Sequence, residues 1–426
     1  MPAPRFETFA ALRHRNYRLF FSGQSISLIG TWMQAMALSW LVLVLTDSAF
    51  YLGLVGALQT LPVLLFIFVG GVLADRTDKR RLLFLTQGAL MLLALVLGVL
   101  VAREAIRVWM VCLLGFGAGI AMSFDIPVRQ SFIVEMVGKP DLPNAIALNS
   151  TLFNATRVVG PALGGILIEW VGMANCFFLN SASFVAVLAA LALMPLPPSP
   201  SNPRVPFKAA LLELAGYIRG QRELLLVLFL MAGLAFFAFP FLVLLPLLAR
   251  DFMGAGAQGF GMLMASSGVG AFLGGLTLAR RLRRRPPMPS FLGGMALFLL
   301  ALLSLAWCRN YYVALGLMFF AGFGMVTHIS TGNSLLQLNV PDDLRGRVMS
   351  LFGLIIMGFS PVGNLLYGIA AHYLGASLAL TGGTLVAGAS AAVILVRHPE
   401  LLHLDYAQLR GPGASDLSEF PSNYRP

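Results

Sequence analysis

The chain has 426 residues, of which 58% are hydrophobic and 11% are charged, and its mean hydropathy is +0.83. Soluble globular domains carry about 25% charged residues, so this composition excludes a soluble protein and indicates one embedded in a lipid bilayer. The net charge of +11 would also suit nucleic-acid binding. However, nearly all the basic residues lie outside the apolar stretches, and we therefore expect no nucleic-acid partner.

Apolar stretches follow one another along the chain, all uncharged except 144–168, which contains Arg157, and a membrane-spanning helix needs roughly 20 apolar residues. The last stretch is long enough for two helices and is expected to divide near His372. The sequence therefore predicts an all-α membrane protein with twelve transmembrane helices. The stretches are 19–46, 48–74, 82–102, 108–124, 144–168, 170–203, 224–249, 252–279, 286–308, 310–341 and 348–396.

Residues 1–18 are polar and basic, and they lack the apolar core and cleavage site of a signal peptide. We expect them to form a cytoplasmic N-terminal segment. With that orientation, all but five of the 29 Lys and Arg residues fall on the cytoplasmic side. This bias follows the positive-inside rule and predicts a multi-pass membrane protein with both termini in the cytoplasm. The five exceptions are Arg103, Arg107, Arg157, Arg250 and Arg309.

Two charged residues at the inner end of span four form a candidate ion pair. Asp125 and Arg129 are one helical turn apart, in the order that favours an ion pair on a helix. They lie next to the basic connection 70–81. The alternative is that they only cap the end of the helix in the headgroup region.

Arg157 falls near the middle of span five, where a guanidinium costs about 2.5 kcal/mol or more unless it is paired or hydrated. No Asp or Glu at that depth offers an obvious partner. Arg157 is therefore a candidate site for an anionic or polar group of a substrate. The alternative is a structural arginine that helix carbonyls and neighbouring Gln or Asn side chains satisfy.

The two halves of the chain repeat. The segment 70–81 (GGVLADRTDKRR) matches 274–285 (GGLTLARRLRRR), and the pair Gly165 and Gly172 answers the pair Gly368 and Gly375. Duplication of a six-span unit predicts two pseudo-symmetric six-helix bundles. The expected organisation is a first bundle at 19–194, a Pro-rich cytoplasmic linker at 195–223 that closes as a surface helix, a second bundle at 224–397, and a disordered cytoplasmic tail at 398–426.

Polar residues within the spans are candidates for substrate binding or coupling. His328 of span ten has a pKa range suited to protonation, although a packing role is the alternative. The others could line an amphipathic cavity, or could equally form hydrogen bonds between helices. They are Gln24, Trp32, Gln34 and Trp40 of span one, and Asn333 and Gln337 of span ten.

Motifs of enzymes are missing from the sequence. It has no HExxH, no GxSxG and no phosphate loop with GK[ST]. The cysteines, Cys112, Cys176 and Cys308, have neither metal nor redox spacing. We therefore expect no enzymatic activity, no ATP-driven step, no cofactor and no metal site.

Three segments resemble the major facilitator superfamily, and the resemblance extends over essentially the whole chain. GVLADRTDKRR (71–81) is similar to the signature loop between spans two and three, with Asp78 where the family usually has Gly. RVVGPALGGIL (157–167) resembles the span-five signature of the antiporters in this superfamily. The segment 124–165 looks most like the subgroup of enterobactin-exporter-like, proton-antiport exporters of drugs and siderophores.

The resemblance implies a role for each motif. Asp75 should face the start of span eleven and hold the cytoplasmic side shut when the transporter faces outward. The residues assigned to this cytoplasmic gate are Asp75, Arg76, Arg80, Asp125, Arg129, Arg345 and Arg347. The small residues of span five should let helices approach closely, with generic packing as the alternative; they are Gly160, Pro161, Gly164 and Gly165.

The implied function is secondary active transport by a monomer in the bacterial inner (plasma) membrane. The resemblance favours export of a small amphipathic molecule, either a drug-like compound or a siderophore, by proton antiport with alternating access. A lysophospholipid or nutrient transporter of the same fold is one alternative. The other is a membrane sensor or secretion accessory protein that transports nothing.

Overall fold

The computed structural model describes residues 9–194, 220–281, 287–340 and 342–403. Within these ranges every regular element is a helix, and twelve helical segments are long and apolar enough to cross a membrane. The predicted all-α fold with twelve transmembrane helices is therefore confirmed.

The first half of the chain contains six of these spans. Its longest helix, α4, crosses twice, because the backbone reverses at Gly138 between the spans Val108–Gly138 and Pro140–Val171. Gly138 has φ 71°, a left-handed conformation that glycine adopts without steric cost. The elements are η1 (Ala10–Arg13), α1 (Arg15–Thr46), α2 (Ala49–Arg76), α3 (Lys79–Ala102), α4 (Val108–Val171) and α5 (Met173–Ala192).

The second half has shorter and more interrupted helices. They are α7 (Arg222–Phe237), η2 (Phe239–Val243), α8 (Leu245–Met253), α9 (Ala257–Arg281), α10 (Pro287–Trp307), α11 (Tyr311–Asn339), α12 (Asp342–Gly358), α13 (Ser360–Leu374), α14 (Ala376–Arg397) and η3 (Pro399–His403). Span seven breaks at η2, where Pro240 lacks the N–H that an α-helix needs. Spans eleven and twelve separate at Gly375, close to the expected position near His372.

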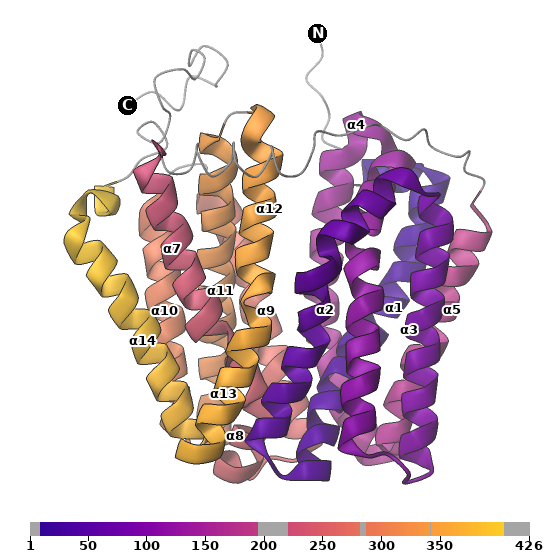
Figure 1. Ribbon diagram of the computed structural model, residues 1–426, viewed down its shortest axis with the longest axis horizontal. Coiled ribbons are helices and arrows are strands. Elements are labelled where there is room, and N and C mark those ends of the chain that lie inside the picture. Colours follow the sequence, from indigo (N-terminus) through magenta and orange to yellow (C-terminus); the bar gives the residue numbers. More distant parts are fainter. Residues whose placement is uncertain (1–8, 195–219, 282–286, 341, 404–426) are drawn as a thin grey trace.

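The two halves form two groups of helices that stand side by side (Figure 1). Both described ends of the chain lie at the same edge of the molecule, as an even number of spans requires. We call this edge the terminal face; it includes the start of α1, the α2–α3 turn, the bend at Gly138 and η3. The opposite edge is called the far face.

Aromatic side chains mark the boundary of the membrane at the far face. Five Trp and Tyr residues at helix ends on this side are between 57% and 79% exposed. Such residues concentrate where a bilayer meets water, because one end of the ring is polar. They are Trp109, Trp170, Trp307, Tyr312 and Tyr373.

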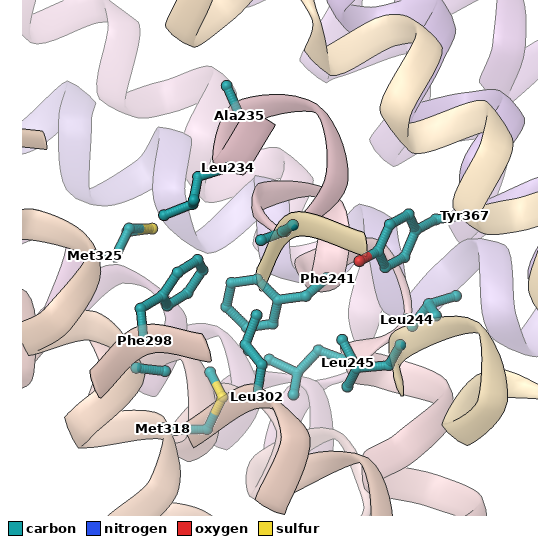
Figure 2. Close-up of a cluster of buried hydrophobic side chains, with 14 of the residues drawn as sticks. Leu234, Ala235, Phe241, Leu244, Leu245, Phe298, Leu302, Met318, Met325 and Tyr367 are labelled. Carbon is teal, nitrogen blue, oxygen red and sulfur yellow. The ribbon is translucent and has the colours of Figure 1, made fainter. Parts of the chain in front are cut away.

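The core of the second bundle closes around the break in span seven (Figure 2). Phe241 of η2 packs edge-on against Phe298 of α10, with ring centroids 5.8 Å apart. Tyr367 of α13 donates its hydroxyl hydrogen bond to the Phe237 carbonyl at the end of α7. The broken span is therefore held by aromatic packing and by a partner for one of its released carbonyls.

The end of the second half differs from the expectation in one place. Within the predicted disordered tail, Pro399–His403 forms the 3₁₀ helix η3, and its Leu401 is buried. The His398 Nδ1 atom lies 3.2 Å from the Arg222 guanidinium and 3.0 Å from the Glu400 carboxylate. These contacts tie the chain to the start of α7. The predicted linker helix and the tail beyond residue 403 lie outside the described residues.

Candidate functional site

The two bundles meet along two pairs of helices. In the first pair, the second span of α4 crosses α9, and Gly165 lies directly against the α9 backbone. A Cβ atom at Gly165 would lie 2.8 Å from both the Ala257 carbonyl oxygen and the Gln258 Cα atom. Gly261 of α9 faces Gly165 in turn. Small residues on both helices therefore permit this close approach.

The second pair, α2 with α13, repeats this geometry. A Cβ atom at Gly368 would lie 2.8 Å from the Gly53 Cα atom. Gly165 and Gly368 are positions that the sequence repeat pairs, and both lie where the bundles cross. Gly172 and Gly375, the other repeat pair, both have φ 85° at the ends of spans five and eleven. The internal repeat is thus visible in the structure.

Contacts between the bundles continue to the far face. Trp40 of α1 stacks on Phe260 of α9, with ring centroids 5.9 Å apart and planes inclined by 22°. The sequence had suggested Trp40 as a cavity residue, and the structure places it in this inter-bundle contact. Glu169 at the end of α4 accepts a hydrogen bond of 3.2 Å from the Gln258 N–H. The positive end of the α9 helix dipole favours a carboxylate there.

An ion pair also crosses between the bundles at the far face. Asp47 ends α1 with φ 45°, a left-handed conformation that Asp tolerates better than most residues. Its carboxylate pairs with the Arg250 guanidinium of α8, whose Nε atom also donates to Asp251 at 2.6 Å. Hydrogen bonds to Asp251 and to Asp47 raise the pKa of Arg250 above its usual range.

This ion pair was not among the residues predicted from the sequence. A signal for it existed, because Arg250 is one of the few basic residues on the side of the membrane that otherwise lacks them. A basic residue on the side that otherwise lacks Lys and Arg indicates a specific local contact. Here the contact is with a partner in the other bundle.

Glycines mark where α9 lies close to α4. Gly261, Gly268 and Phe272 lie along one stripe of α9. The two glycines are buried against α4, whereas Phe272, one turn further on, is 38% exposed. On α4, Phe153 is 45% exposed. Among the α9 glycines, the close contacts with α4 thus run from Gly261 to Gly268, whereas Gly270 and Gly274 face α11.

Arg157 lies at the Gly268 end of these contacts. Its backbone abuts Gly268 of α9, since a Cβ atom at Gly268 would lie 3.0 Å from the Arg157 carbonyl oxygen. Its side chain is half-buried and has neither a hydrogen bond nor an ion pair within the described part of the chain. One turn earlier, Phe153 packs edge-on against Trp32 of α1 at 5.5 Å. The structure thus brings the candidates Arg157 and Trp32 together and adds Phe153.

The other polar candidates lie elsewhere. Gln34 accepts a 2.8 Å hydrogen bond from Asn180 of α5, and Gln24 is buried. His328 is fully buried inside the second bundle, stacked on Phe291 at 4.1 Å, with its Nδ1 atom 3.1 Å from the Phe291 carbonyl oxygen. These contacts are the helix-to-helix packing that the sequence left open as the alternative.

The polar pair of span ten lies near the terminal face. Gln337 is exposed and donates a hydrogen bond of 3.0 Å to Asn333, one turn earlier on α11. This pair is close to the end of the helix, away from the middle depth at which Arg157 lies.

The span-five motif packs on two neighbours at once. Gly160 and Gly164 face α1: a Cβ atom at Gly160 would lie 2.5 Å from the Trp32 Cβ atom and 2.9 Å from the Ile29 carbonyl oxygen. Pro161 and Gly165 face α9 in the other bundle. One short motif therefore contributes both to the fold of the first bundle and to the contact between bundles.

A buried polar cluster lies in the first bundle toward the terminal face. Asp125 is fully buried and accepts hydrogen bonds from Thr86 at 3.0 Å and Gln87 at 2.7 Å. It also forms the predicted ion pair with Arg129. Lys79 of α3 also pairs with Glu135 of α4, which the sequence did not suggest. Asp125 thus has a partner for each of its carboxylate oxygens.

The remaining residues of the predicted gate are only partly described. Arg80 donates a hydrogen bond of 2.8 Å to the Ala192 carbonyl at the end of α5. Asp78 caps α3 by accepting from the Arg80 and Arg81 N–H groups, which explains how a non-glycine residue fits the signature loop. The side chains of Asp75, Arg76, Arg345 and Arg347 lie outside the described residues, so the contact of Asp75 with span eleven stays a prediction.

The sequence matches a known protein family and is similar to bacterial transporters. A family model described as "transmembrane secretion effector" matches residues 6–411. The chain is 26% identical over 366 residues to a staphyloferrin A transporter of Staphylococcus aureus, covering 84% of this chain and 90% of that protein. It is 28% identical over 345 residues to an enterobactin exporter of Shigella flexneri, covering 80% of this chain and 81% of that protein.

Solved structures share the fold. One is a bacterial homologue of the human lysosomal transporter Spinster, in an inward-facing and unoccupied conformation. It has a TM-score of 0.76 at 14% identity and covers 94% of this chain and 99% of that one. An inward-facing bacterial homologue of the iron transporter ferroportin has a TM-score of 0.68 at 16% identity. It covers 89% of this chain and 98% of that one. At these identities the likeness concerns the fold alone.

Proposed function

The chain belongs to the transmembrane secretion effector family of the major facilitator superfamily, and is therefore a transporter and not an enzyme. From that premise we propose that it exports a small amphipathic molecule of the siderophore class. In this proposal a monomer in the bacterial inner membrane drives export by proton antiport, and the two bundles rock about a site near the middle of the membrane.

The observation that carries the proposal is the position of Arg157 at the contact between the bundles. The close glycine contacts between α4 and α9 reach from the far face to Arg157, whose side chain is only partly buried; in this proposal a substrate reaches Arg157 from the terminal side. The positive-inside bias of the sequence assigns the terminal face to the cytoplasm. With that orientation, the proposal assigns this arrangement to an inward-facing state that is ready to take up a substrate from the cytoplasm.

The siderophore class is supported by the curated relatives, whose names specify staphyloferrin A and enterobactin. The scarcity of acidic residues near Arg157 also fits an anionic substrate better than a cationic one. A lysophospholipid or nutrient substrate remains the alternative within transport. A sensor or secretion accessory would bind a partner without moving any substrate.

Transport by the purified, full-length protein in liposomes tests the proposal. We expect enterobactin or staphyloferrin A to move against its gradient when protons flow the opposite way, and to stop when a protonophore collapses the pH gradient. Protein-free liposomes are the control. Transport of a lysophospholipid or a nucleoside in place of siderophores would support the alternative, and failure to move any of them would contradict the proposal.

A first prediction concerns the cross-bundle ion pair. Exposed ion pairs contribute about 0.2–1 kcal/mol, so Asp47→Asn or Arg250→Gln should increase the population with an open far face by about 1.4- to 5-fold. The change is measured as maleimide labelling of Ala257→Cys, a buried position of α9 at the far face, in a background without the native cysteines.

Asp251→Asn is the matched control, because it removes a carboxylate from the same arginine without removing the contact between bundles. We expect labelling of this variant to stay near the wild-type rate. Equal labelling in all three variants would mean that the Asp47–Arg250 pair does not contribute to closure of the far face.

A further inference from the structure

Arg157 carries a positive charge at middle depth, and no group in the described part of the chain pairs with it. Its side chain is half-buried and lacks a hydrogen bond or an ion pair there. A guanidinium at the centre of a membrane helix costs about 2.5–3.5 kcal/mol unless it is paired or hydrated. Since the side chain is only partly buried, a compensating group can reach it.

The surroundings of Arg157 are aromatic. Phe153 lies one turn earlier on the same side of α4 and remains 45% exposed, although its edge packs against Trp32. Trp32 is held in position because α1 approaches α4 closely at Gly160. A Cβ atom added to Gly160 would lie 2.5 Å from the Trp32 Cβ atom. The guanidinium thus lies within one helical turn of a rigid pair of aromatic rings.

Three helices meet at this place. Gly160 brings α1 against α4, and Gly268 brings α9 against the Arg157 backbone. Beyond Gly268, the next glycines of α9, Gly270 and Gly274, face α11 instead. A molecule bound here would touch both bundles, and closure around it would change its contacts.

The chemistry of these groups selects a ligand. A guanidinium is a planar fork that binds carboxylate-like oxygens through two parallel hydrogen bonds. An edge-to-face aromatic pair leaves ring surface available for stacking by a further ring. We infer that Arg157, Trp32 and Phe153 form a binding site for an aromatic ring that carries an anionic oxygen group. This inference rests on the proposed function and specifies the substrate class.

Three matched probes test the inference by calorimetric titration of the purified, full-length protein. 2-Naphthoate has both the ring and the charge, 2-naphthamide lacks the charge, and decahydro-2-naphthoate lacks the aromatic ring. We expect the wild-type protein to bind 2-naphthoate at least tenfold more tightly than either of the others. Equal affinity for the three probes would overturn the inference.

Variants then assign each preference to a side chain. Arg157→Gln should bind the acid and the amide equally, and Arg157→Lys should be intermediate because lysine lacks the planar fork. Phe153→Leu should keep the preference for the acid over the amide and lose the preference for the aromatic ring. Arg309→Gln, an exposed arginine near the far face, is the matched control and should bind like the wild type.

The outcomes separate this inference from the proposed function. If Arg157→Gln folds, as judged by size-exclusion chromatography, and binds 2-naphthoate as tightly as the wild type, the site assignment is wrong. If the wild-type protein transports siderophores but shows no preference among the probes, the proposed function stands and the site assignment fails. If the probe preferences appear but no substrate moves in liposomes, the site stands and the proposed function fails.

Discussion

Replacing Gly165 with alanine is expected to open the far face of the transporter while leaving both bundles folded. The added Cβ atom would lie 2.8 Å from backbone atoms of Ala257 and Gln258, and backbone cannot rotate away as a side chain can. Overpacking of this kind costs about 1–3 kcal/mol. Because the contact exists only between the bundles, that cost falls on the state in which the far face is closed.

The same motif contains the contrasting variant. Gly160→Ala would place a Cβ atom 2.5 Å from the Trp32 Cβ atom and 3.0 Å from the Met33 N atom, inside the first bundle. It should therefore reduce the yield of folded protein. Gly164→Ala should be milder, since its nearest neighbours, the Met33 Cγ atom and the Met33 carbonyl oxygen, lie at 3.2 Å, further away than those of Gly160. Gly316→Ala on α11 is the control, because nothing lies within 4 Å of its added Cβ.

Two measurements distinguish these effects. Maleimide labelling of Ala257→Cys reports opening of the far face, and it should rise at least fivefold for Gly165→Ala, which corresponds to about 1 kcal/mol. Size-exclusion chromatography reports folding, and only Gly160→Ala should lose a large part of its monodisperse peak. Loss of folding by Gly165→Ala, with labelling of the remaining protein unchanged, would contradict a role specific to the contact between bundles.

Asp125→Asn is expected to destabilise the first bundle strongly. The carboxylate is fully buried, accepts two hydrogen bonds and pairs with Arg129. Removing one partner of a buried ion pair costs about 3–5 kcal/mol, because the other charge stays buried without compensation. The Arg129 Nε atom already lacks a partner in the described part of the chain, so the arginine has little to replace the carboxylate.

A double-mutant cycle separates the ion pair from the rest of the cluster. Asp125→Asn combined with Arg129→Gln should recover most of the loss in thermal stability, measured by unfolding in detergent. Asp141→Asn is the matched control, since its ion pair with His14 is half-exposed and should contribute at most about 1 kcal/mol. If the double variant is less stable than Asp125→Asn alone, the hydrogen bonds from Thr86 and Gln87 are the main stabilising contacts of Asp125.

Much of this molecule follows from the sequence by local rules. A bilayer permits only long apolar helices, so the number of spans and most of their limits could be predicted from hydropathy alone. The Asp125–Arg129 ion pair also follows from local geometry, because residues one turn apart on a helix always face one another. The depth of Arg157 could likewise be predicted by counting along its span.

Only the tertiary structure decided which helices touch and which residues meet there. In a membrane protein the surface that faces lipid is as apolar as the surface that faces another helix, so hydropathy does not distinguish them. For this reason the sequence could not assign Gly160 to α1 and Gly165 to α9, although they stand five residues apart in one motif. Asp47 and Arg250, and Trp32 and Phe153, are likewise far apart in the chain, and their contacts depend on how the helices pack around one another.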